Sequence, residues 1–155
     1  MAITTDIDWP DVLPCALREG HSTQHGTPFQ RTEMDSGRAR NRRRFGSVPS
    51  QEQFAWLFTA VQCRAFEAWY RDALGDGVGW FNMSVRSPLG VQPQVCRFVQ
   101  MYTGPELVGV DGWKVSALLE IWARPLLPPG WGHLPEVITG ASILDRAVNK
   151  EWPEA

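Results

Sequence analysis

The sequence predicts a mainly β protein: an antiparallel β-sandwich or curled sheet with one packed α-helix and extended N- and C-terminal arms. Several segments alternate apolar and polar residues with the period of two that is typical of strands. One segment places apolar residues at the three-and-four spacing of an amphipathic helix. Proline and glycine, with 12 and 14 residues, cluster near the two ends of the chain, which favours extended arms there.

Size and charge restrict the function classes. The chain has 155 residues, the size of one domain, and its 43% hydrophobic and 21% charged residues are typical of globular proteins. The net charge of −2 gives no global electrostatic reason to bind nucleic acid. No apolar run approaches the roughly 18 residues of a membrane span, and the first residues lack the pattern of a secretory signal. We therefore expect synthesis in a cytoplasm and no membrane partner.

The amino-terminal half of the chain divides into an arm and two strands. Residues 1–37 show no periodicity, so we interpret them as an extended N-terminal arm, with a turn of helix as an option around Cys15–Arg18. Residues 38–48 predict a strand with a strongly basic face, and residues 53–61 predict an aromatic strand. One face of this second strand carries Phe54, Trp56 and Phe58.

A helix is predicted over residues 61–74. Thr59 or a neighbour is expected to cap its start. Gly75 is expected at the C′ position, because glycine adopts positive φ without a Cβ clash. The apolar residues that recur at steps of three and four are Cys63, Phe66, Trp69, Tyr70, Ala73 and Leu74.

Three further strands are predicted after the helix, over residues 78–85, 95–102 and 113–124. A tight connection is expected at residues 87–90, and residues 104–112 are interpreted as a turn region. Short connections between consecutive strands favour antiparallel pairing, with the helix packed on the sheet. The predicted core consists of Phe54, Trp56, Phe58, Phe66, Trp69, Leu74, Trp80, Phe81, Phe98, Val115, Leu119 and Ile121.

The last part of the chain, residues 126–155, is interpreted as a C-terminal arm in which residues 142–152 could form a short helix. The predicted division is therefore an arm over residues 1–37, a core over residues 38–125 and this second arm. Trp occurs eight times, and nearly all basic residues are arginine; both types are enriched in the buried centres of protein interfaces. Such arms gain stability when their own domain or a neighbouring subunit covers their apolar residues.

The sequence contains no catalytic or cofactor motif. There is no Gly-x-Ser-x-Gly turn, and the glycine-rich stretch after the helix has the wrong polarity for a phosphate site. Cys15, Cys63 and Cys96 form no CxxC pair and are expected to be small buried side chains. His21 and His25 have metal-compatible spacing only in a helix, and their neighbours favour a loop. We therefore predict a non-enzymatic protein without cofactor, metal or catalytic residues.

The arginine run at the start of the predicted core is a candidate binding surface. Arginine holds carboxylates bidentately, which suits a protein interface, whereas the acidic balance of the chain argues against nucleic acid. Glu120 is expected on a solvated face and would need a partner such as Arg97 if it pointed inward. The candidate subunit-interface residues are Arg38, Arg40, Arg42, Arg43, Arg44, Trp9, Trp131 and Trp152.

A series of basic and aromatic phrases runs in order through residues 38–125. The phrases are Arg44-Phe-Gly, a helix from Cys63 to Gly75, Gly79-Trp-Phe, Cys96-Arg-Phe and a closing strand from Trp113 to Arg124. In this order the chain resembles bacteriophage tail structural proteins, in particular the minor tail or distal-tail adaptor type of long-tailed phages. The resemblance implies that the helix packs on the aromatic strand and that the closing strand completes the sheet.

The resemblance also implies a function: a non-enzymatic virion protein that forms a ring joining the tail tube to the tail tip or baseplate. The implied partners are other copies of the chain, commonly six or three in a ring, and the neighbouring tube and tip proteins. The implied location is the phage tail, after synthesis in the bacterial host cytoplasm. Head-to-tail contact in a ring needs two different lateral faces, which the arginine strand and the arms would supply.

Two alternatives stay open. Within the same class, the chain would be a tail terminator or a head–tail connector protein. From another class, it would be an assembly chaperone or a nucleic-acid-associated module using the Arg38–Arg44 stretch. Salt separates these classes, because binding to nucleic acid weakens steeply with salt, whereas a ring held by buried Trp and Leu weakens much less.

Overall fold

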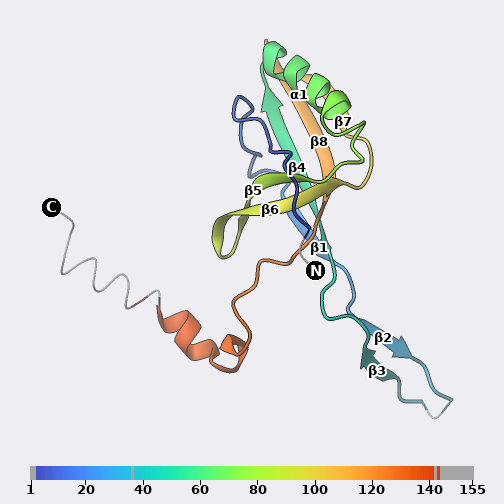
Figure 1. Cartoon of the computed structure of the whole chain (residues 1–155). Helices are drawn as coiled ribbons and strands as arrows, with labels where there is room; N and C mark the ends of the chain where they lie inside the picture. Colours follow the sequence, from blue (N-terminus) through green and yellow to red (C-terminus); the bar gives the residue numbers. More distant parts are fainter. Residues whose placement is uncertain (1–2, 36, 142, 144–155) are drawn as a thin grey trace. The chain divides into compact units, whose positions relative to one another are not determined.

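The structure of the chain is a computed structural model that describes residues 3–35, 37–141 and 143 (Figure 1). The chain divides into two compact units, Met1–Arg124 and Pro125–Ala155, which are described separately. The first unit contains an antiparallel sheet, a two-stranded hairpin and a helix of 13 residues. The predicted fold class, mainly β with antiparallel strands and a packed helix, is therefore confirmed.

The main sheet has six strands, and β8 lies at its centre. β4 pairs with β8 on one side along its whole length, from Ser50 opposite Ile121 to Phe58 opposite Trp113. The other side of β8 is shared between β7 and β6. In sheet order the strands are β1 (Ser22–His25), β4 (Ser50–Phe58), β8 (Gly112–Ile121), β6 (Gly90–Phe98) and β5 (Phe81–Ser87), with β7 (Thr103–Val108) also on β8.

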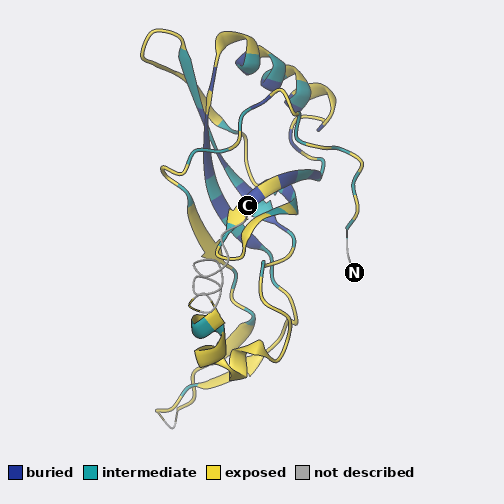
Figure 2. Cartoon of the chain, turned by 90° about the vertical axis from the view of Figure 1, so that its left-hand side faces the viewer, coloured by how far each residue is buried: buried dark blue, intermediate teal, exposed yellow. Residues whose placement is uncertain are grey.

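The alternation read from the sequence identifies the inner face of the sheet. Phe54, Trp56 and Phe58 on β4 are buried, as predicted, because alternate side chains of a strand point to the same face. β8 behaves in the same way, since Val115, Ala117 and Leu119 are buried while the residues that alternate with them are half-buried. Figure 2 shows these two strands as the most continuously buried part of the chain.

The helix α1 (Ala60–Asp72) matches the predicted residues closely. Thr59 caps it: the Thr59 hydroxyl accepts from the Gln62 backbone N–H, and the Gln62 side chain accepts from the Thr59 N–H. The C-cap is Ala73, so the C′ residue is Leu74 and not Gly75 as predicted, although Gly75 does adopt a positive φ of 58°. The helix buries Cys63, Phe66 and Tyr70 against the sheet because these residues share one face.

Most of the predicted core is buried, but two tryptophans differ. Trp69 is only partly buried, although it packs against the core. Trp80 is half-buried and lies outside the core cluster, where its ring stacks with the Arg97 guanidinium at 4.4 Å. Cys63 and Cys96 are buried as expected. The core also contains residues outside the predicted set: Leu13, Ala55, Tyr70, Met83, Val85 and Ala117.

Two strand predictions required correction. Residues 104–112 were interpreted as a turn, but β7 occupies Thr103–Val108 and pairs with β8. Every residue of β7 is exposed, so its sequence carries no inward–outward alternation. The predicted start of β6 was five residues late, because β6 begins at Gly90, directly after the tight connection that was correctly predicted.

Residues 1–37 contribute to the first unit. Ile7 and Trp9 lie against the start of β5, where an isolated parallel bridge joins Asp8 to Asn82. Farther on, the Leu17 N–H donates to the Ala55 carbonyl of β4 at 2.7 Å. The optional helical turn at Cys15–Arg18 is not formed, and the stretch around the histidines is strand β1 rather than a loop.

The second unit contains a short 3-10 helix at Trp131–His133, followed by helical residues at 135–141. The helix predicted over residues 142–152 falls almost entirely outside the described residues. None of the helices among the described residues is long and apolar enough to cross a membrane.

Candidate functional site

The arginine run lies on a two-stranded hairpin formed by β2 (Phe29–Thr32) and β3 (Arg40–Arg43). All eight of their residues are exposed, and Figure 1 shows the hairpin beyond the ends of β1 and β4. The predicted basic strand therefore exists but is short, and it does not begin the main sheet. Its partner β2 was missed because neither of its faces is buried, so its sequence carries no alternation.

The hairpin presents its arginines in two ways. Arg43 is used internally: its guanidinium donates to the carbonyls of Phe45 at 3.2 Å and Gly46 at 3.0 Å. Arg40 and Arg42 share the other face with Gln30 and Thr32, where these side chains line a shallow hollow. Arg43 thus stabilises the base of the hairpin, while Arg40 and Arg42 are available to a partner.

The remaining arginines have no carboxylate partner among the described residues. The only ion pair within the described part of the hairpin joins Arg31 to Glu33, both of them highly exposed. Arg38, Arg40, Arg42 and Arg44 are exposed and lie close together in sequence. Because like charges repel, such a strip favours binding to a surface that supplies carboxylates or phosphates.

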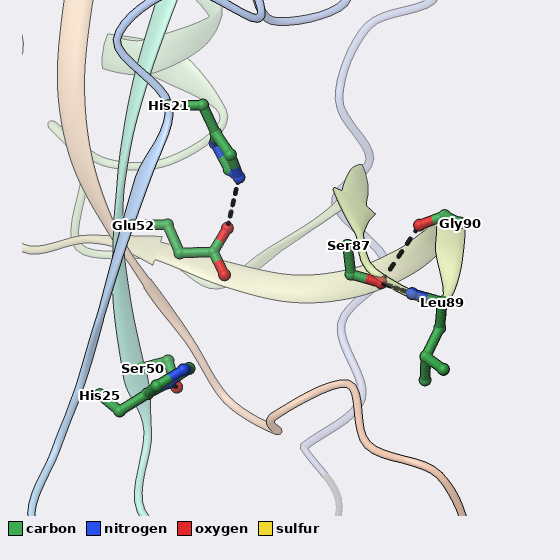
Figure 3. A network of polar contacts seen from close by, with 7 residues as sticks. All are labelled: His21, His25, Ser50, Glu52, Ser87, Leu89 and Gly90. Carbon is green, nitrogen blue, oxygen red and sulfur yellow. Dashed lines mark hydrogen bonds and ion pairs between the residues drawn. The ribbon is translucent and has the colours of Figure 1, made fainter. Parts of the chain in front are cut away.

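A polar cluster lies where the hairpin meets the main sheet, and it links β1 and the residue before it to two buried residues of β4. Ser50 and Glu52 are buried on the inner face of β4, at 0% and 4% exposure. Figure 3 shows His25 of β1 and His21, which directly precedes this strand, beside them. His25 Nδ1 lies 2.8 Å from the Ser50 hydroxyl, and His21 Nε2 lies 3.6 Å from Glu52 Oε2. The cluster therefore fixes β1 to β4 at the root of the hairpin.

Glu52 is an electrostatically strained member of that cluster. Burial raises its pKa above the ordinary value, and the neighbouring His21, the Thr23 hydroxyl and His25 oppose this rise. Its Oε2 atom has no hydrogen-bond partner within the described part of the chain. Sequence reasoning missed this residue because Glu52 precedes the aromatic run that suggested the strand.

The cysteines are not activated by this cluster. Burial raises the pKa of the Cys96 thiol to about 12, and Glu52 adds to the rise, so the thiol stays protonated at neutral pH. Cys63 is buried too, with its pKa raised mainly by burial. Cys15 differs from its prediction, because it is exposed. Among the described residues, no three His, Cys, Asp or Glu side chains gather as a metal site.

Two adjoining cavities lie between the N-terminal segment and strand β5. The first, of about 360 Å³, is lined by Trp9, Asp11, Trp56 and Pro93, among others. The second, of about 320 Å³, extends from Ala16 to Arg86. Both cavities share Cys15, Ala16 and Ser84, so they form one groove along the edge of β5.

The outer face of the sheet carries a different polar group. Arg97 pairs with Glu120 at 2.5 Å on neighbouring strands, so Glu120 has the partner that the sequence suggested for it. Trp80 stacks on this arginine and contacts Trp122 edge to face. Since both charges are neutralised within the chain, this face is a weaker candidate for binding than the hairpin.

The three predicted tryptophan contacts lie in different environments. Trp9 is partly buried: it stacks on Trp56 with ring centroids 5.1 Å apart and packs against the core of its own unit. Trp131 is 43% exposed in the second unit. Trp152 lies outside the described residues.

Comparisons with known proteins give no relative: no protein-family model, no curated protein and no solved structure matches the chain. The features of the structure that bear on function are therefore the arginine hairpin, the polar cluster at its root and the groove along β5.

Proposed function

We propose that the chain is a non-enzymatic structural component of a phage tail, forming a ring that joins the tail tube to the tail tip or baseplate. The observation that carries the proposal is the exposed hairpin, where Arg38, Arg40, Arg42 and Arg44 lack carboxylate partners among the described residues. An isolated subunit gains little from such a strip, whereas an assembled subunit places it against carboxylates of a neighbour. This role agrees with the resemblance of residues 38–125 to tail structural proteins.

Exposed apolar side chains of the second unit support an assembly role as well. They lie on and near the short helices, and an assembly would remove them from water. Monomeric proteins seldom leave so many large apolar residues uncovered in one short stretch. These exposed residues are Leu126, Leu127, Trp131, Leu134 and Val137.

The alternative placement within the tail, as a terminator or head–tail connector, uses the same surfaces. A nucleic-acid-associated role is the alternative from another class, since unpaired guanidinium groups also bind phosphates. Titration of the chain with duplex DNA at increasing salt would separate the two. A binding constant that falls steeply with salt supports the nucleic-acid role, and the absence of binding at low salt supports the structural one.

The decisive experiment is antibody–gold labelling of purified tail particles from the source strain, viewed by negative-stain microscopy. Label at the tail tip supports the adaptor role. Label at the head-proximal end supports the terminator or connector role instead. Unlabelled particles, with the protein detected in the lysate by the same antibody, would contradict a place in the virion.

A further inference from the structure

We propose that the β2–β3 hairpin of one copy docks into the groove along β5 of the next copy, adding a strand to its sheet. This contact rests on the proposed function, since it is the one that would join neighbouring copies in the proposed ring. A second copy of this chain fits the groove because β5 has a free edge, a groove lies beside that edge and the charges of the two surfaces are complementary.

The outer edge of β5 is only partly used. β5 is the last strand of the sheet, and its only outer partner among the described residues is the N-terminal segment at Asn82. There, the Asn82 N–H donates to the Ile7 carbonyl and the Trp9 N–H donates to the Asn82 carbonyl, both at 2.8 Å. Because backbone groups alternate along a strand, Ser84 and Arg86 direct theirs to the same outer edge.

The register of the β5–β6 pair supports this reading of the edge. Ser84 lies opposite Pro93, which has no backbone N–H to donate. The two residues therefore form a non-hydrogen-bonded pair, in which the Ser84 backbone groups point away from β6. Ser84 and Arg86 are both exposed. β5 therefore offers backbone donors and acceptors to an added strand just beyond Asn82.

The groove beside this edge is built to receive side chains. Its inner wall includes the core aromatics Phe54 and Trp56.

Complementary charge indicates that the hairpin is the segment that binds the groove, and it indicates the orientation of the hairpin there. One end of the groove carries the exposed carboxylates Asp8 and Asp11, and the other end carries Arg18 and Arg86. The hairpin has Arg40 and Arg42 along one face, while Glu33 and Asp35 follow β2 toward its tip. The arginines would face the aspartates, and Asp35 near the tip would face the basic end.

The lengths also correspond. From Ser84 to Ser87 the free edge spans four residues, and β2 and β3 each have four. Both are therefore about 13 Å long at about 3.3 Å per residue. The hairpin and the groove are different surfaces of one chain, so their contact repeats head to tail and closes into a ring if the rotation permits.

A first test reverses the charges and uses mass photometry of the purified chain. Arg40→Glu with Arg42→Glu makes both hairpin and groove acidic at the contact, and Asp8→Arg with Asp11→Arg makes both basic. Each double variant should raise the half-assembly concentration at least tenfold. Mixing the two variants should restore assembly, since each hairpin then meets a groove of opposite charge. Arg64→Glu on the exposed side of α1 should assemble like the unaltered chain.

A second test uses the native thiol in the groove. Cys15 is exposed and lines both cavities, and Gln30 shares the hairpin face of Arg40 and Arg42. Gln30→Cys should give a ladder of covalent oligomers on a non-reducing gel under mild oxidation. Adding Cys15→Ser should abolish the ladder, and Arg64→Cys should give none.

The outcomes separate this contact from the proposed function. Assembly of folded charge-reversed variants at the wild-type concentration, or no restoration on mixing, would overturn the docking while leaving a structural role intact. A wild-type chain that stays monomeric, together with a Gln30→Cys variant that gives no ladder of covalent oligomers, would overturn it too. Gold labelling of tails judges the structural role independently of either result.

Discussion

At the scale of single residues, the structure gives special importance to side chains that the sequence pattern does not distinguish. In the sequence, Glu52 is one more polar residue at the edge of an aromatic run. In the structure it is buried on β4, and its carboxylate contacts His21, which directly precedes β1. Trp9 looks like an exposed arm residue, yet it stacks within the core. In both cases a segment distant in sequence supplies the environment.

Glu52→Gln is expected to change how stability depends on pH. Burial raises the folded-state pKa of Glu52, so the folded chain holds this proton more tightly than the unfolded chain. The contribution of the Glu52 carboxyl to the free energy of unfolding therefore falls as pH rises from its ordinary pKa through its folded-state pKa. The amide of the variant does not titrate, so this loss of stability disappears. Urea denaturation at pH 5 and pH 8 should show the variant gaining relative to the wild type as pH rises. A constant difference would contradict the buried-carboxylate account.

Gly77→Ala tests the close approach of the loop after α1 to the helix. Gly77 has a φ of 85°, and a Cβ there would overlap the Tyr70 hydroxyl. Gly75, with a φ of 58°, has open space around it and provides the matched control. Gly75→Ala should cost about 1 kcal/mol of unfolding free energy from backbone strain, and Gly77→Ala about 2 kcal/mol or more. Equal losses would show that the contact with Tyr70 carries no cost.

At the scale of elements, local signals determine the helix, and distant pairing determines several strands. α1 has an amphipathic face and a capping box within its own sequence, so its position could be predicted within two residues at each end. β2, β3 and β7 are exposed on both faces and exist only through their partners. The basic run was predicted as a strand, but its hairpin pairing was not.

Thr59→Ala should destabilise α1 through the loss of its cap. The Thr59 hydroxyl satisfies one of the first free N–H groups of the helix, so its removal is expected to cost about 1 kcal/mol. Thermal unfolding followed by circular dichroism should show a fall of about 3 °C in Tm. Gln62→Ala in the same background should cost less than it does alone, because the two side chains act as a reciprocal pair.

At the scale of the whole molecule, the chain is organised as a packed unit with surfaces left for partners. Every buried core residue that the structure describes lies between Leu13 and Ile121. The hairpin and the second unit bury none of this core. Their exposed arginines and apolar residues are therefore free to make contacts with other molecules, which is the basis of the proposed assembly.

Truncation after Arg124 is expected to leave a folded protein. Because the core lies within the first unit, the unfolding free energy of residues 1–124 should stay within about 1 kcal/mol of the full chain. Urea denaturation followed by tryptophan fluorescence provides the measurement. A loss of cooperative unfolding would show that residues 125–155 belong to the folding unit.

The sequence by itself determined the fold class, the inner faces of β4 and β8 and the helix with its cap. Burial imposes a periodicity on the elements that carry it, so these elements could be read locally. It also identified the arginine run, and it offered Arg97 as the partner that Glu120 would need if it pointed inward. Only the tertiary structure decided the exposed strands, the burial of Glu52, the packing of Trp9 against the core, and the groove along β5. Each of these depends on which distant segments become neighbours, and backbone pairing between exposed strands leaves no pattern in the side chains.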